Sequence, residues 1–262
     1  MVVGAGVSKN ATQAGLRVSP TPTALPSTTA STSPVPSPSL FVGPSPSGCL
    51  PLPSCPETTA IGNFEGTGQK QNFVAAPVND KGGATVDWLL EIRGPTGTSH
   101  SASLSSLVAA RGGCPALGDI QYARVLGAAD FGGPSPDLAL VEVGRGASTQ
   151  SAVLVGVEGD GLRVVTVVSG AERCQRVFPF NGSVTHGNGL ACGWRDNTPV
   201  LWVREVSSRP PTDYAHYDWY EATYAWQGLN LTLLSLDHAI ITSKDQRFQP
   251  AYGVTCGGIN LP

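Results

Sequence analysis

Short apolar runs bounded by turn-forming residues dominate the chain from about residue 57 onward. Residues 137–143, 150–157 and 162–168 are three consecutive examples, each rich in Val and Leu. Asp160 and Gly161 lie between the last two runs, and an Asp-Gly pair in that position is a strong hairpin signal. No long window shows the 3.6-residue period of an amphipathic helix. The pattern therefore predicts an all-β domain in which helix is nearly absent.

The strand pattern recurs along the chain, with a cysteine at the start of each repeat. Cys55, Cys114 and Cys174 are almost evenly spaced, and each is followed by a turn and several strand-like runs. Each repeat has the composition of four short antiparallel strands, which is the composition of one propeller blade. We therefore predict three blade-like, four-stranded antiparallel units, at about residues 57–110, 115–170 and 175–242.

Three blade-like units are fewer than the four to eight blades that close a propeller. The predicted fold is therefore a partial or open propeller, half of a dimeric six-blade ring, or a sandwich-like curled sheet, and these alternatives stay open. An open arrangement exposes edge strands that must be protected or paired.

A Pro/Ser/Thr-rich segment precedes the β-rich domain. Residues 19–56 hold eleven of the 22 prolines and no charged residue, so they cannot bury enough apolar surface to offset the entropy of ordering them. We predict a disordered N-terminal stalk, extended by its prolines, that carries a β-rich globular domain at residues 57–262. Residues 1–18 are interpreted as the remnant of a membrane anchor or signal. A disordered cytoplasmic tail is the alternative.

Six cysteines without a CxxC pair favour a disulfide framework over a zinc or thioredoxin-like site. Such a framework implies an oxidising compartment, so we predict an extracytoplasmic protein that is secreted, held in the cell wall or anchored to a membrane. We predict the pairs Cys49–Cys55 and Cys174–Cys192, and the alternative is that several thiols are reduced and buried. The disulfide candidates are Cys49, Cys55, Cys114, Cys174, Cys192 and Cys256.

The charge balance argues against nucleic acid as a partner. The formal net charge is −3 and only 13% of the residues are charged, which leaves no basic footprint for a phosphate backbone. No stretch reaches the roughly 18 apolar residues of a membrane span. We therefore expect contact with a membrane only through an anchor that is missing from this chain.

Three turn regions share an aromatic residue with neighbouring glycine and polar residues. They are residues 62–73, 129–140 and, in degenerate form, 192–199. These segments resemble the FG-GAP repeat of β-propeller proteins. The resemblance implies an extracellular adhesion or binding scaffold whose turns often supply oxygen ligands to calcium. Asp130 and Asp137 are the calcium candidates it implies here, and the alternative is that both carboxylates bond their own turn.

The stretch at residues 214–226 is the most unusual of the chain, since six of its thirteen residues are Tyr or Trp. On a strand, alternate side chains point to opposite faces, which separates Tyr217 and Trp219 from Tyr220 and Tyr224. Tyr and Trp are enriched at recognition surfaces, which predicts a ligand-binding patch. The alternative is that these rings pack in the core and cover cross-strand neighbours. The predicted ligand-binding residues are Tyr214, His216, Trp219, Tyr220 and Trp226.

No catalytic signature accompanies these features. The sequence contains no G-x-S-x-G elbow, no phosphate-cradling loop and no histidines at metal-ligand spacing. We therefore predict a non-catalytic, extracytoplasmic, surface-associated binding or structural module on a flexible stalk, with no cofactor and no metal. Its expected partner is a cell-envelope glycan or protein that the sequence does not identify. The alternative is an exported hydrolase whose site assembles from loops.

Overall fold

The computed structural model describes residues 57–262, except for residues 119, 121, 131–135, 210–212 and 214. The predicted anchor remnant and stalk, with Cys49 and Cys55, lie outside the described residues. The described part of the chain is all-β, as predicted. Within it, helix is limited to α1 (Leu104–Leu107) and the 3₁₀ turn η1 (Gln249–Ala251).

The first sheet is a four-stranded antiparallel meander. It consists of β1 (Thr58–Gly62), β2 (Gln71–Asn79), β3 (Thr85–Gly94) and β4 (Gly97–Ser103), paired in chain order. Along β3, the buried residues Trp88, Leu90 and Ile92 alternate with more exposed ones, because successive side chains of a strand point to opposite faces. α1 follows β4 directly and packs in the same core through Leu104.

The second sheet is larger and mixed. Its strands follow the order β5-β6-β7-β10-β11-β12-β13-β14-β9, with β8 paired to β7 and β15 paired to β11 and β16. The consecutive strands β8 and β9 pair with strands that lie far apart in this order, so the sheet curls, but it is not closed into a barrel. The strands are β5 (Arg124–Ala129), β6 (Leu138–Arg145), β7 (Thr149–Glu158), β8 (Gly161–Val164), β9 (Thr166–Val167), β10 (Phe178–Ser183), β11 (His186–Arg195), β12 (Thr198–Ser208), β13 (His216–Gln227), β14 (Asn230–Thr242), β15 (Val254–Cys256) and β16 (Ile259–Leu261).

The three predicted units meet different outcomes. The first corresponds to the separate four-stranded sheet, and the predicted hairpin at Asp160-Gly161 joins β7 to β8. The prediction that the second and third units are separate blades is wrong, because β7 pairs with β10 from Ala152↔Phe178 to Thr149↔Asn181. Strand pairing across the predicted boundary therefore merges the two units into one sheet.

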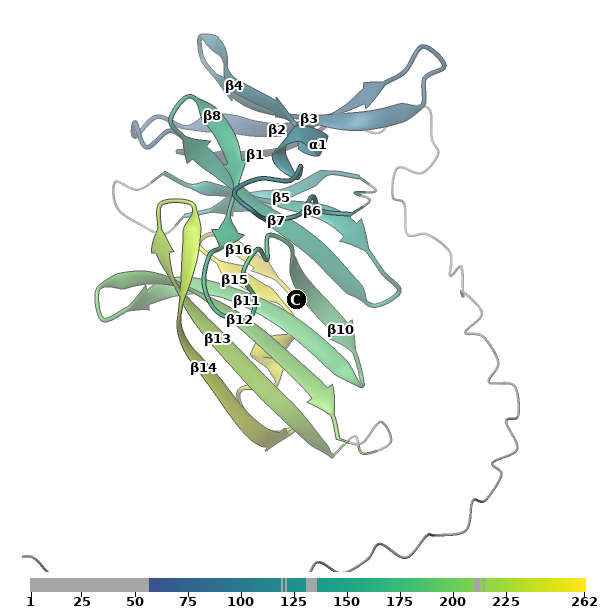
Figure 1. The fold of residues 1–262 in the computed structure, drawn as a ribbon, viewed down its shortest axis with the longest axis vertical. Coiled ribbons are helices and arrows are strands. Elements are labelled where there is room, and N and C mark those ends of the chain that lie inside the picture. The colour runs from purple at the N-terminus through teal and green to yellow at the C-terminus, as the bar shows by residue number, and fades with distance from the viewer. Residues whose placement is uncertain (1–56, 119, 121, 131–135, 210–212, 214) are drawn as a thin grey trace, which may run out of the picture. The chain divides into compact units, whose positions relative to one another are not determined.

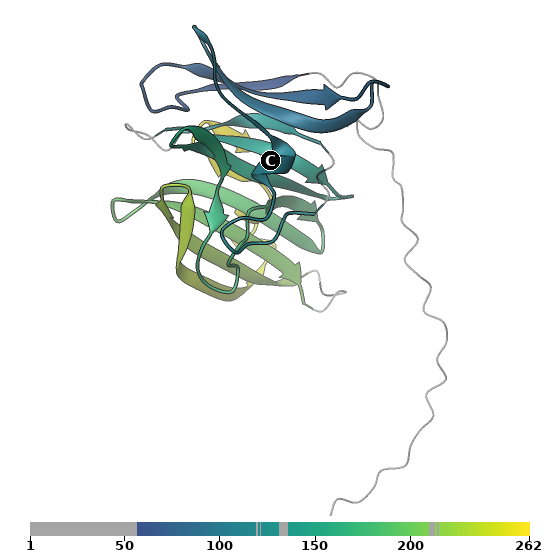
Figure 2. The ribbon, with the colours of Figure 1, turned by 45° about the horizontal axis from the view of Figure 1, so that its top comes forward.

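β6 and β7 form a middle layer that is buried on both faces, below the four-stranded sheet at the top of Figures 1 and 2. Val141 and Val153 pack into the core shared with the four-stranded sheet. Leu140 and Leu154 pack into a second core, which includes Tyr224 of β13. Burial on both faces explains why these strands are nearly continuous apolar runs in the sequence.

A buried carboxylate lies within β6. The Glu142 side chain is 0% exposed, accepts a hydrogen bond of 2.5 Å from the Tyr122 hydroxyl and one of 2.8 Å from Arg145 Nε. Arg124 Nη2 lies 2.7 Å from its second oxygen. Burial, followed by the hydrogen bond to Glu142, raises the pKa of the Tyr122 hydroxyl. Glu142 is thus enclosed by two cations and a neutral phenol.

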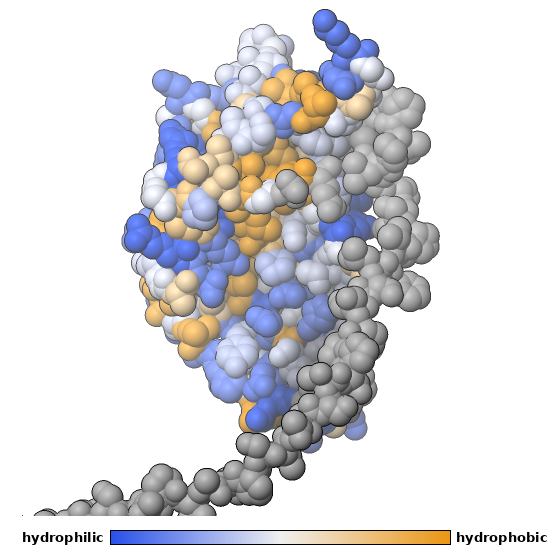
Figure 3. Space-filling view, turned by 45° about the vertical axis from the view of Figure 1, so that its right-hand side comes forward, coloured by the Kyte–Doolittle hydropathy of each residue, from blue (hydrophilic) through white to orange (hydrophobic). Residues whose placement is uncertain are grey.

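The surface mixes polar and apolar side chains. On the face in Figure 3, hydrophobic residues gather mainly in the upper half and hydrophilic residues in the lower half. Large apolar residues are also exposed on β14, at Leu236 and Ile240. Neither helix in the described ranges has the length and apolar character that a membrane-spanning helix requires.

Candidate functional site

The predicted aromatic patch is divided between two cores and the surface. Tyr217 and Trp219 lie in a small core with Phe248, whose ring centroid is 4.7 Å from that of Tyr217. Tyr224 is buried in the second core, and Trp226 packs against it. Packing therefore accounts for these four rings, and Tyr214 lies outside the described residues.

Tyr220 and His216 are the predicted patch residues that the structure leaves exposed. The Tyr220 ring stacks on His238 at a centroid distance of 4.5 Å, and His238 Nε2 lies 3.0 Å from Asp218 Oδ1. His216 Nδ1 lies 3.3 Å from Asp213 Oδ2. Hydrogen bonds from the backbone N–H of residue 215 and from His216 hold the pKa of Asp213 below its usual value. A ligand-binding role for Tyr220 and His216 stays a prediction.

Within the described residues, the two calcium candidates have different surroundings. The Asp137 carboxylate is largely buried and accepts a hydrogen bond of 2.6 Å from the Asn63 N–H, so it holds the β1–β2 turn against the start of β6. Asp130 directly follows the last residue of β5. Among the residues that the structure describes, no group of three or more His, Cys, Asp or Glu side chains is placed to hold a metal ion.

The two disulfides are Cys114–Cys174 and Cys192–Cys256, with Cα–Cα distances of 5.2 and 4.4 Å. The predicted pair Cys174–Cys192 is wrong. β15 runs parallel to β11 with Ala191 opposite Thr255, which brings Cys256 beside Cys192. Gly189 permits this approach, because a Cβ there would overlap the backbone of the C-terminal segment.

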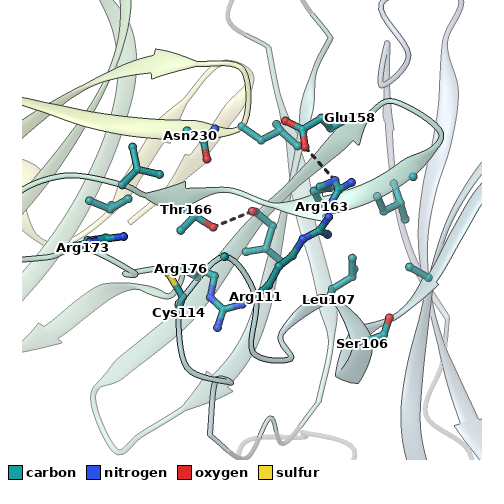
Figure 4. A pocket seen from close by; sticks show the side chains of 18 of the residues that line it. Ser106, Leu107, Arg111, Cys114, Glu158, Arg163, Thr166, Arg173, Arg176 and Asn230 are labelled. Atoms are coloured by element: carbon teal, nitrogen blue, oxygen red, sulfur yellow. Dashed lines mark hydrogen bonds and ion pairs between the residues drawn. The ribbon is translucent and has the colours of Figure 1, made fainter.

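A cleft of about 500 Å³ lies beside the other disulfide. Its walls come from β4, α1, the loop after α1, the β7–β8 hairpin, β9, the loop after β9, the β13–β14 turn and the start of β14 (Figure 4). Apolar side chains of Leu107, Leu162 and Leu229 contribute to the lining. The charged residues of the cleft are Arg111, Glu158, Arg163, Arg173 and Arg176. Four arginines thus face a single carboxylate.

Two loops that carry three of these arginines are tied together. Arg111 and Cys114 form a β-bridge, with backbone hydrogen bonds of 3.0 and 2.9 Å. Arg173 precedes Cys174, whose φ of 77° lies in the left-handed region that non-glycine residues rarely adopt. The Cys114–Cys174 disulfide therefore joins the Arg111 loop to the Arg173 loop.

Arg176 reinforces the same junction. Its side chain donates a hydrogen bond of 3.0 Å to the Ala109 carbonyl and another to the Pro115 carbonyl, across from its own loop. The residue is 4% exposed, and burial lowers the pKa of its guanidinium. Its Nε atom has no hydrogen-bond partner among the described residues. Arg176 is therefore a buried cation held by carbonyl groups.

The other arginines of the cleft differ in how they are paired. Arg163 Nε lies 3.0 Å from Glu158 Oε2, an ion pair drawn in Figure 4. Arg111 and Arg173 are exposed, and neither side chain forms an ion pair within the described residues. Two guanidinium groups are thus accessible to a ligand from two tied loops.

The cleft offers binding groups more clearly than catalytic ones. No histidine and no free thiol belongs to its described lining. Ser101, Ser106 and Thr166 contribute hydroxyl groups, and those of Ser106 and Thr166 already donate to the carbonyls of Ser103 and Val164.

Sequence reasoning did not identify the arginines of the cleft. A local signal was present, since Arg111 precedes Cys114 by three residues, and Arg173 and Arg176 flank Cys174. Had the pairing of Cys114 with Cys174 been predicted, these three arginines would have been placed together.

Comparisons with known proteins found no matching family model, no similar curated protein and no similar solved structure. The function is therefore inferred from the residues of the cleft and from the features of the sequence.

Proposed function

We propose that this chain is an extracytoplasmic, surface-associated binding module carried on its Pro-rich stalk, and that its ligand binds in the cleft beside Cys114–Cys174. The observation that carries the proposal is that a disulfide and Arg176 together fix the two loops of the cleft. Preformed walls lower the entropic cost of binding. The partner is a cell-envelope glycan or protein.

Several features support display outside the cytoplasm. Two disulfides lie within the described residues, and disulfides persist in oxidising compartments. The uncharged, proline-rich residues 19–56 have the composition of a spacer. Both the disulfides and the proline-rich segment suit a domain that is displayed outside the membrane.

We also propose that the three turn regions that resemble FG-GAP repeats share a common origin. The first copy spans the β1–β2 turn, the second spans the β5–β6 connection, and the third spans the β11–β12 turn. Each copy therefore falls at a connection between antiparallel neighbours, which supports a common origin.

Export can be tested on intact source cells with an added protease. We expect the β-rich domain to be digested while a cytoplasmic marker protein stays intact. Protection of the domain to the same extent as the marker would contradict display outside the membrane.

Binding can be tested by sedimenting the purified full-length chain with isolated cell envelopes. Ser101→Trp places a large ring in the cleft, and Ser99→Trp places the same ring on the same strand outside the lining. We expect saturable sedimentation that Ser101→Trp reduces and Ser99→Trp preserves. Equal sedimentation of the two variants would remove the cleft from the proposed function.

A further inference from the structure

We infer that the cleft binds a ligand carrying at least two oxyanion groups, such as carboxylates, sulfates or phosphates. This inference rests on the proposed function, because it names the chemistry of the ligand at the same site. Arginine suits such groups, since its planar guanidinium donates paired hydrogen bonds to carboxylate and phosphate oxygens.

The lining of the cleft carries an excess of positive charge. Four guanidinium groups and one carboxylate line it, which leaves three positive charges in excess. A concave surface with low-dielectric walls concentrates the field of such charges. An anion entering the cleft is therefore attracted by the whole lining and by individual contacts.

Arg176 adds a buried guanidinium to this lining. Its hydrogen bonds go to two backbone carbonyls, and no carboxylate pairs with it within the described ranges. An uncompensated buried cation is costly. A bound anion would lower that cost, so the cleft by itself is electrostatically incomplete and the occupied cleft is not.

Two further arginines of the cleft indicate how many anionic groups the ligand carries. Arg111 and Arg173 lie on different loops, and the Cys114–Cys174 disulfide limits how far these loops can separate. Each arginine has an exposed guanidinium without an ion pair among the described residues. Two unpaired cations on loops that are tied together match a ligand with two anionic groups better than a single monovalent ion.

The chain cannot supply this ligand from its own N-terminal segment. Residues 1–56 contain no Asp and no Glu. Residues 1–56 therefore offer no carboxylate side chain to the cleft, and we assign the oxyanion groups to another molecule. The hydroxyl and apolar residues of the lining leave room for the uncharged part of that molecule.

The test is calorimetric titration of the full-length chain with four probes. Trigalacturonate carries three carboxylates on a sugar chain, tripolyphosphate carries phosphates without a sugar, maltotriose is a neutral trisaccharide, and acetate is a single carboxylate. We expect at least one polyanion to bind, with an affinity that falls as salt rises, and maltotriose and acetate to bind far more weakly. Tighter binding of trigalacturonate indicates an acidic glycan, and tighter binding of tripolyphosphate indicates a phosphate ligand.

Variants connect binding to the named arginines. We expect Arg111→Ala and Arg173→Ala each to weaken polyanion binding about tenfold, as loss of a charge-assisted hydrogen bond does, and the double variant to weaken it about a hundredfold. Arg195→Ala removes an exposed arginine outside the cleft and serves as the matched control. An unchanged near-ultraviolet circular dichroism spectrum shows that each variant is folded.

Two outcomes overturn the inference: equal binding of maltotriose and the polyanions, or unchanged polyanion binding in the double variant. Failure of the proposed function looks different, because the chain then binds no cell envelope. If envelope binding persists in the double variant and in the presence of excess polyanion, the binding module stands and the oxyanion chemistry is wrong.

Discussion

Arginine occurs in two clusters of this domain, and the two clusters are built in opposite ways. Around Glu142, two arginines and a tyrosine surround one fully buried carboxylate, so each oxygen of that carboxylate has a cationic partner inside the fold. In the cleft, four arginines line the same cavity as one half-exposed glutamate, and three of them have no ion pair within the described residues. Matched charge serves the fold, whereas unmatched charge beside a cavity is available to a ligand.

The largest expected effect concerns the disulfide that holds the cleft together. Replacing Cys114 and Cys174 by Ser opens a loop whose ends are 60 residues apart in sequence, and loop entropy predicts a loss of about 4 kcal/mol in the free energy of unfolding. Urea unfolding monitored by Trp fluorescence measures it. Polyanion affinity should also fall, because the arginine loops separate. An unchanged affinity in the folded variant would show that the disulfide does not position the arginines.

Removing the Glu142 carboxylate should cause the next largest loss in the free energy of unfolding. Glu142→Ala leaves the Tyr122 hydroxyl and Arg145 without their acceptor, and we expect a loss of about 3 kcal/mol in the free energy of unfolding. Glu158→Ala removes an exposed carboxylate that also pairs with an arginine, and should cost less than about 1 kcal/mol. Similar losses for both variants, measured by urea unfolding, would end the distinction between the clusters.

Removing the negative charge of Glu158 should strengthen polyanion binding, whereas removing an arginine of the cleft should weaken it. Glu158→Gln removes the one negative charge of the lining and frees Arg163. We expect polyanion affinity to rise about two- to fivefold, in line with the strength of an exposed ion pair. Calorimetric titration at low salt measures the change. A weaker affinity would contradict the claim that the excess positive charge of the cleft attracts the polyanion.

The smallest expected effect is a dependence of stability on alkaline pH. Burial, aided by Glu142, raises the pKa of Tyr122 above its ordinary value of 10.0, so the folded state retains a proton that the unfolded state loses. The contribution of Tyr122 to stability should therefore be constant below about pH 10 and decrease as pH rises above it. Tyr122→Phe should flatten this decrease in thermal melts. Part of the slope should remain, because burial also raises the pKa of Tyr252 to about 12.

The sequence predicted the parts of this structure that depend on neighbouring residues. The alternation of apolar and polar positions identified the strands, and Asp160-Gly161 identified the β7–β8 hairpin. The pairing of Cys192 with Cys256 was missed, because it depends on β15 lying beside β11, and the two cysteines are 64 residues apart in sequence. The cleft was missed for the same reason, since Arg111, Arg163 and Asn230 meet only after both sheets have formed.

The ladder between β7 and β10 has a consequence for how this domain can evolve. Proteins built from separate repeats gain or lose a unit by duplication or deletion, because each unit contacts only its neighbours. Here the second and third units share backbone hydrogen bonds from Ala152↔Phe178 to Thr149↔Asn181. Deleting either unit would expose an unpaired strand edge that invites aggregation. Loss of one unit of this recurring strand pattern would therefore break the ladder that joins the second and third units.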